Sequence, residues 1–144
     1  MLFDAHTHIN ERSLSDKERA DFIKSVEDAG MDGAVDVGYD LESSALAAKH
    51  AEMYDWCYAA AGCHPHDADS FDEIQLEMIR GLALKKKVVA IGEIGLDFYR
   101  NLSDPEVQEY WFRRQIQLAN ELKMPIVIHE RDAVQAVMDI LKEE

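Results

Sequence analysis

The sequence has few basic residues and no long apolar run. Its 15 Lys and Arg stand against 29 Asp and Glu, for a formal net charge of −14. This balance argues against a basic nucleic-acid-binding surface, because such surfaces use Lys and Arg to displace counterions from phosphates. If the protein handles phosphates, bound metal cations must supply most of the positive potential. No apolar run approaches the roughly 18 residues that span a bilayer, and no basic segment followed by an apolar core begins the chain, so we expect neither a membrane partner nor a signal peptide.

Cysteine is also scarce, with Cys57 and Cys63 as the two examples. Both fall in one apolar run that we expect to be extended, where six residues of strand cover about 20 Å. A disulfide requires Cα atoms about 4–7 Å apart. We therefore expect two free thiols, which fits a reducing cytosol and a cytoplasmic location.

The chain is long enough for one domain, residues 1–144, and its 47% hydrophobic content is ample for a core. Five short apolar runs are rich in β-forming residues and are nearly continuous rather than alternating. Such runs are typical of parallel strands covered on both faces. The expected strands are Leu2–His6, Ala34–Tyr39, Trp56–Gly62, Val88–Ile94 and Pro125–His129.

Helical segments separate these runs, and their first turns carry capping residues. Ser15 with Glu18 and Ser70 with Glu73 match the capping-box pattern, in which the first side chain and the fourth bond each other's main chain. The other expected caps are Asp40, Asp104 before Pro105, and Asp132, which would start a last helix running to about Lys142.

Strand and helix thus alternate five times, which predicts a parallel sheet with right-handed crossovers. An open doubly wound sheet and a closed (β/α)₈ barrel both satisfy this plan. No Gly-x-Gly-x-x-Gly follows the first strand, which disfavours a dinucleotide-binding open sheet. Polar residues gather at the carboxyl ends of the strands, where TIM barrels build their active sites. Because a full barrel takes about 250 residues, we expect an α/β fold of the TIM (β/α)₈ type, here an incomplete barrel of about five units.

The first candidate site residues are His6 and His8, at the end of the first expected strand. Residues two apart on an extended backbone point the same way, so both imidazoles would face one point. Neutral imidazole is a preferred ligand of zinc and similar divalent ions. Taken alone, this pair is weak evidence, because such a pair more often arises by chance or has a structural role.

Glu93 and His129 end two further strands. A carboxylate at the end of an apolar run needs a cation nearby, because burying an unpaired charge costs several kcal/mol. That cation could be a metal ion or an arginine such as Arg131. In a barrel, Glu93 and His129 would share one mouth with His6 and His8, which makes a site for one or two divalent ions (Mg, Mn or Zn) the better interpretation.

Four stretches identify a family. FDAHTHIN, GCHPHDA, AIGEIGLDFYR and MPIVIHERDA, in this order and spacing, resemble the TatD family of metal-dependent deoxyribonucleases, within the amidohydrolase-like metal-bearing barrels. The resemblance covers the whole chain, as the N-terminal part of such a barrel. It implies a one- or two-metal centre at the carboxyl end of the strands that acts on phosphodiester bonds of DNA.

By motif match, the resemblance implies that His6, His8, Glu93 and His129 are metal ligands, with Glu93 also the catalytic carboxylate that can bridge two ions. It further implies that His64 lies near the substrate phosphate and that Arg131 adds positive charge there. Members of the family carry another ligand histidine after the sixth strand, and an aspartate general base at the end of the eighth. Neither segment occurs in these 144 residues, so we expect weak activity from this chain alone.

Two other functions remain open at this stage. The same metal core could hydrolyse a small amide or ester, since fold and metal do not fix the substrate. The chain could also be a noncatalytic half-barrel whose open strand edges associate with another chain, in a homo-oligomer or with a missing C-terminal half. For a DNA substrate, the net charge of −14 leads us to expect single-stranded or frayed ends.

Overall fold

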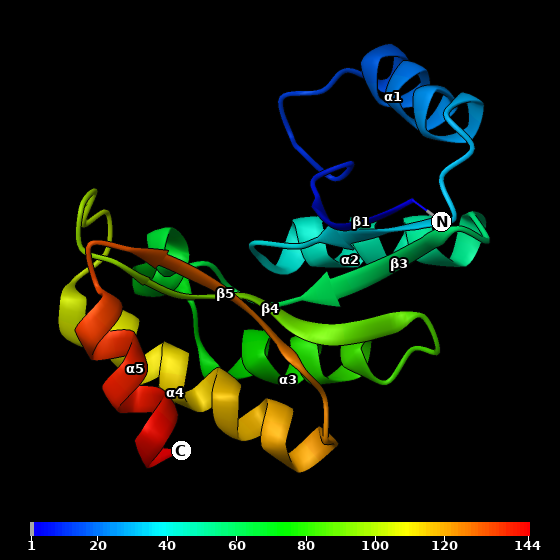
Figure 1. Ribbon diagram of the computed structural model, residues 1–144. Helices are drawn as coiled ribbons and strands as arrows, with labels where there is room; N and C mark the ends of the chain where they lie inside the picture. The colour runs from blue at the N-terminus through cyan, green and yellow to red at the C-terminus, as the bar shows by residue number, and fades with distance from the viewer. Residues whose placement is uncertain (1) are drawn as a thin grey trace.

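A computed structural model describes residues 2–144 and contains one parallel sheet with its strands in sequential order, β1-β2-β3-β4-β5. One α-helix follows each strand, and a 3₁₀ helix precedes it after β3 (Figure 1). The strands are β1 (Phe3–Thr7), β2 (Gly33–Val37), β3 (Cys57–Ala61), β4 (Val88–Asp97) and β5 (Ile126–Arg131). The helices are α1 (Asp16–Asp28), α2 (Leu41–Met53), a 3₁₀ helix η1 (Pro65–Ser70), α3 (Glu73–Ala83), α4 (Pro105–Leu122) and α5 (Val134–Glu143).

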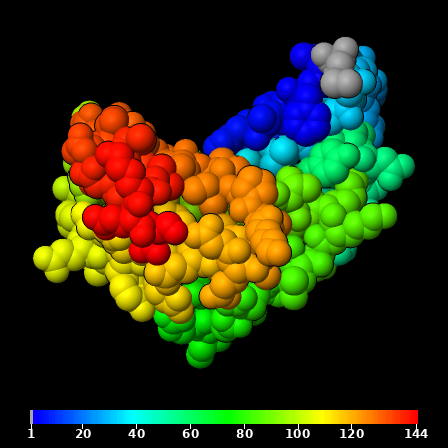
Figure 2. All heavy atoms as spheres, turned by 60° about the horizontal axis from the view of Figure 1, so that its bottom comes forward, coloured from blue at the N-terminus to red at the C-terminus, as the bar shows by residue number. Residues whose placement is uncertain are grey.

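The sequential strand order is that of a barrel, whereas doubly wound sheets reverse direction at a switch point. Every neighbouring pair is parallel, and within residues 2–144 no pairing joins β1 to β5. In the space-filling view, the N-terminal and C-terminal residues form two arms with a hollow between them (Figure 2). The prediction of an incomplete barrel of five β/α units is confirmed.

The main core lies between the sheet and its helices. Ala59 and Ala61 of β3 and Ile91 of β4 are fully buried there, against residues of α2, α3 and α4. The opposite, inner face of the sheet carries a smaller cluster in which Val35, Val37, Ala60 and Ala90 are buried. Ala59 and Ala61 on the outer face of β3 are small, which lets the helices pack closely against the sheet.

The helix starts test the capping predictions. Ser15 with Glu18 forms the expected capping box on α1, and Asp40 and Asp104 cap α2 and α4. The prediction for Ser70 is wrong, because that residue is the last of η1. Asp72 caps α3 instead, and its side chain accepts the main-chain N–H of Gln75 at 2.8 Å.

The prediction for Asp132 is also wrong. Asp132 has a φ of 53°, and Ala133 occupies the cap position of α5 without a side-chain bond. A left-handed residue is needed there to turn the chain from β5 into α5.

Both cysteines are free and buried, as the spacing predicted. In the part of the chain that the structure describes, no helix is both long and apolar enough to cross a membrane.

Candidate metal centre

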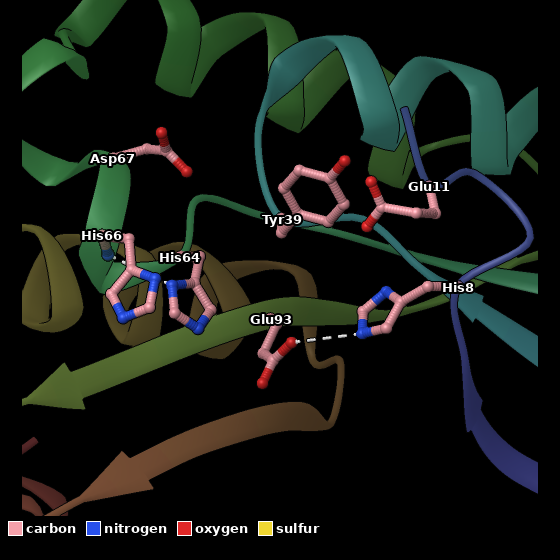
Figure 3. Close-up of a pocket in the computed structure, with 7 residues that line it drawn as sticks. All are labelled: His8, Glu11, Tyr39, His64, His66, Asp67 and Glu93. Atoms are coloured by element: carbon pink, nitrogen blue, oxygen red, sulfur yellow. Dashed lines mark hydrogen bonds and ion pairs between the residues drawn. The ribbon is translucent and has the colours of Figure 1, made fainter. Parts of the chain in front are cut away.

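The carboxyl ends of β1, β4 and β5 bring the candidate ligands together. His6 lies in β1, His8 follows it directly, Glu93 lies in β4 and His129 in β5. In a parallel sheet these ends share one edge, which is why residues up to 123 positions apart can meet. Glu93 lies between His8 and His64 in a pocket of about 350 Å³, with Tyr39, Glu11 and Asp67 along its other wall (Figure 3).

The first group consists of His6, His8 and one oxygen of Glu93. The Nε2 atoms of the two histidines are 3.2 Å apart, and they lie 3.4 Å and 3.7 Å from Glu93 Oε2. These three atoms are close enough to share one ion. Their donor set, two imidazole nitrogens and a carboxylate oxygen, suits zinc, manganese or a similar divalent cation.

A hydrogen bond fixes which nitrogen of His8 faces this group. The Nδ1 atom of His8 lies 2.8 Å from the carbonyl oxygen of Val37, which can only accept a hydrogen bond. Nδ1 therefore carries the proton, and in the neutral imidazole Nε2 presents its lone pair to His6 and Glu93. The lone pair of His8 and the carboxylate oxygen of Glu93 thus face each other, an arrangement that a cation between them would stabilise.

Glu93 connects this first group to a second one. Its Oε1 atom lies 3.3 Å from Nδ1 of His129, whereas Oε2 faces His6 and His8. Burial raises the pKa of Glu93, but the hydrogen bond with His129 and the nearby His64 and His6 outweigh burial and lower it overall. The carboxylate is thus charged at neutral pH and can hold one cation on each oxygen.

The second group contains His64, His66 and His129, whose ring nitrogens also lie close enough to share an ion. Asp97 anchors two of them, with its Oδ2 atom 2.7 Å from Nε2 of His66 and 3.0 Å from Nε2 of His129. When Asp97 accepts N–H bonds from both rings, the Nδ1 atom of His129 is left to face Glu93. The hydrogen bond to Glu93 and that to Asp97 raise the pKa of His129 against the effect of burial. A proton on His129 and a divalent cation are therefore alternative partners of the same carboxylates.

Asp97 is itself held rigidly. It is fully buried, and its Oδ1 atom accepts the main-chain N–H of Arg100 at 2.8 Å. Burial raises the pKa of Asp97, but the bonds from Arg100, His66 and His129 lower it well below its usual range. Neither Asp97 nor His66 was among the predicted site residues, although both belong to the stretches that carry the family resemblance. The signal was available in β4, since Glu93 and Asp97 are both acidic residues in an otherwise apolar strand.

His64 is a neutral member of this centre. Burial, followed by the charge of His129, lowers its pKa to about 3. Its Nδ1 atom accepts the main-chain N–H of His66 at 3.1 Å, so Nε2 carries the proton and is the free donor. His64 lines the pocket beside Glu93, where the sequence interpretation expected substrate.

Arg131 does not pair with Glu93, so the structure contradicts the alternative of a simple salt bridge. Its guanidinium instead lies over the ring of Tyr99, with Cζ 3.9 Å from the ring centroid. The partners of Glu93 are imidazoles, and within residues 2–144 no arginine or lysine forms an ion pair with it.

A buried network supports His8 from behind. The fully buried Asp36 accepts two bonds from Asn10, at 3.1 Å from N and 2.8 Å from Nδ2, and its other oxygen lies 2.7 Å from Nδ1 of His50. Asn10 also donates to the carbonyl of Val37 at 2.9 Å, the same carbonyl that holds His8. The turn after β1 is thereby tied to β2 and α2, and this linkage orients the His8 ring.

We expect Asp36→Asn to weaken divalent-metal binding about 10–100-fold, the usual effect of disturbing a ligand's hydrogen-bonded support. The new amide group would face the donors of Asn10 or His50 and leave one of them without an acceptor. Isothermal titration with Mn²⁺ or Zn²⁺ measures the effect. Ser44→Ala is the matched control, because Ser44 is equally buried on α2 but bonds Gly62. Equal metal affinity in the two variants would contradict the role of Asp36.

A barrel-type sheet with a histidine–carboxylate centre at the carboxyl ends of its strands is the plan of the metal-dependent (β/α) barrels. Comparison with known sequences specifies the family. A family model described as TatD related DNase matches residues 3–144, and the chain belongs to this family.

Known relatives align with all or nearly all of this chain. It is 42% identical over 144 residues to the uncharacterized metal-dependent hydrolase YabD of Bacillus subtilis, covering 100% of this chain and 56% of that protein. It is 40% identical over 141 residues to the 3'-5' ssDNA/RNA exonuclease TatD of Escherichia coli K12, covering 98% and 54%. The crystal structure of the TatD homologue YjjV from E. coli K12 superposes with a TM-score of 0.85 at 27% identity, over 99% of this chain and 55% of that one. The chain thus spans about half the length of the relatives it matches.

Proposed function

We propose that this chain carries the metal-binding part of a hydrolase that cleaves phosphodiester bonds of single-stranded DNA. The observation that carries the proposal is the position of Glu93, whose two oxygens face two different imidazole groups. A carboxylate in this position is suited to bridge two divalent ions. The names of the relatives, a metal-dependent hydrolase and an exonuclease of single-stranded DNA and RNA, support the same class of reaction.

In this proposal His6, His8 and Glu93 hold one ion, while Glu93 and His129 contribute to a second. When bound, such ions supply positive charge to phosphodiester oxygens and lower the pKa of a water molecule toward neutrality. His8 is kept in its ligating tautomer by Val37, and His129 is oriented by Asp97. The carboxylate of Glu93 offsets the repulsion between two cations held close together.

His64 has a separate role in the proposal. Because its pKa is lowered to about 3, it stays neutral and offers an N–H donor at Nε2. A neutral donor can bind a phosphate oxygen without repelling metal ions close to it. Glu11 and Asp67 make the remainder of the pocket acidic, so a phosphate is attracted there only when cations are present.

The first test is a substrate panel with a metal-stripped chain. We expect no hydrolysis without metal, and slow cleavage of linear single-stranded DNA after Mn²⁺, Mg²⁺ or Zn²⁺ is restored. Covalently closed single-stranded circles should resist, because the acidic surface favours short free ends over long DNA. The Glu93→Gln chain, purified in the same way, controls for contaminating nuclease.

Two outcomes would contradict the proposal in different ways. Equal cleavage of circles and linear strands would exclude the preference for free ends. Faster hydrolysis of an amide or lactone than of DNA and a phosphodiester model compound would instead favour a small-molecule hydrolase with the same metal core.

A further inference from the structure

Two arginines next to Asp97, Arg100 and Arg131, have no ionic partner within residues 2–144. Elsewhere in residues 2–144, arginine side chains bond carboxylates or main-chain carbonyls. Those bonded arginines are Arg12, Arg19, Arg80, Arg113 and Arg114. Arg100 and Arg131 are exposed, and across the described chain their side chains make neither a hydrogen bond nor an ion pair. In a protein with 29 acidic residues, a guanidinium without a carboxylate is available to an external anion.

Arg131 lies on the same face of its strand as the candidate ligand His129. Val127, His129 and Arg131 alternate along β5, and Val127 packs in the cluster on the inner face of the sheet. Arg131 is therefore displaced from His129 by two residues, about 6.6 Å along the strand toward the mouth. Its Cα pairs with that of Asp97, the residue that anchors His66 and His129.

Tyr99 sets the orientation of this guanidinium. Cζ of Arg131 lies 3.9 Å from the centroid of the Tyr99 ring, while 62% of Tyr99 remains exposed. The main-chain N–H of Phe98 donates to the carbonyl oxygen of Arg131 at 2.9 Å, which joins the two segments beneath the stacked pair. A guanidinium stacked on a ring keeps its N–H groups free at the edge, where they can bind a phosphate.

We propose that Tyr99 and Arg131 bind the nucleotide that follows or precedes the metal-bound phosphodiester in a single strand. This inference rests on the proposed function and names how that site recognises its strand. The guanidinium edge contacts the phosphate of the neighbouring nucleotide, and the exposed part of the Tyr99 ring stacks on its base. An unpaired base has a free face for such stacking, whereas a base in a duplex is already stacked on its neighbours.

Binding of a fluorescein-labelled oligothymidylate, measured by anisotropy in EDTA, tests the pair without catalysis. We expect Arg131→Ala and Tyr99→Ala to weaken binding about tenfold, the usual effect of losing one stacked base. Tyr99→Phe should bind like the wild type, and Arg131→Lys should bind weakly because it keeps the charge but loses the planar stack. Lys86→Ala is the matched control: it removes the same charge from an exposed residue in the turn before β4, at the opposite end of the strands.

The base contribution has its own comparison. Against an abasic oligonucleotide of equal length, Tyr99→Ala should lose less affinity than against oligothymidylate, because the base contact is absent and only the orientation of Arg131 is disturbed. Equal losses for Arg131→Ala and Lys86→Ala would overturn the proposal, because net charge alone would then explain binding. A strand that binds through Tyr99 and Arg131 but is never cleaved with metal would overturn the proposed function and leave this inference standing. Metal-dependent cleavage with binding unaffected by Arg131→Ala, Arg131→Lys and Tyr99→Ala would overturn this inference and leave the proposed function standing.

Discussion

Glu93→Gln should lower the affinity of the chain for divalent metal by about 100-fold or more, beyond the usual effect of changes outside the ligand shell. Glutamine keeps the shape of the side chain but removes its charge and replaces one ligand oxygen with an amide nitrogen. That nitrogen carries two hydrogens and cannot coordinate, so one of the two imidazole groups loses its carboxylate. Any metal-dependent hydrolysis by the chain should fall with the metal affinity.

Titration with Zn²⁺ in competition with a chromophoric chelator measures this change. Glu130→Gln is the control, because it removes the same charge from an exposed residue next to His129. Circular dichroism of both variants reports on the fold. If Glu93→Gln binds metal as tightly as Glu130→Gln, Glu93 is not a ligand and the metal centre needs another carboxylate.

Gly95→Ala should destabilise the fold by about 2–4 kcal/mol and displace His129. Gly95 has a φ of 146°, a conformation that residues with a side chain rarely adopt. It pairs with His129 across β4 and β5, and a Cβ atom at this position would collide with the carbonyl oxygen of His129. The two strands must then separate at the point where the centre is built.

Urea unfolding measures the loss of stability, and metal titration measures the displacement of His129. Gly81→Ala on α3 is the matched control, since a Cβ there meets nothing within 4 Å and alanine favours a helix. We expect that control to be neutral or slightly stabilising. Equal stability of the two variants would show that β4 and β5 can separate at Gly95 without cost.

The strands were predictable because their apolar runs are continuous. A strand that is covered on both faces buries nearly all of its side chains, so few of its positions can be polar. Each expected strand overlaps an observed one, and the ends differ by at most three residues. The largest difference is in β4, which was expected to stop at Ile94 and continues to Asp97. Pairing with β5 extends the strand, and local sequence does not contain that information.

The same extension explains what the sequence interpretation of the site lacked. The His-x-His pair, Glu93 and His129 were identifiable from their places at strand ends. Asp97 lies in the centre because β4 is longer than expected. His66 lies there because it belongs to η1, a helix that was not expected. His50 is buried against Asp36 behind the site. Contacts of this kind depend on how α2 packs, which only the folded chain determines.

The sheet leaves β1 and β5 as its two edges, and the candidate ligands come from both of them. His6 and His8 belong to one edge strand and its turn, His129 belongs to the other, and Glu93 reaches toward each group from β4. Their meeting point therefore depends on the arc of the whole sheet. Flattening the sheet would separate the two sets of imidazoles. A cation bound between them would therefore resist flattening and stabilise the curvature of the sheet.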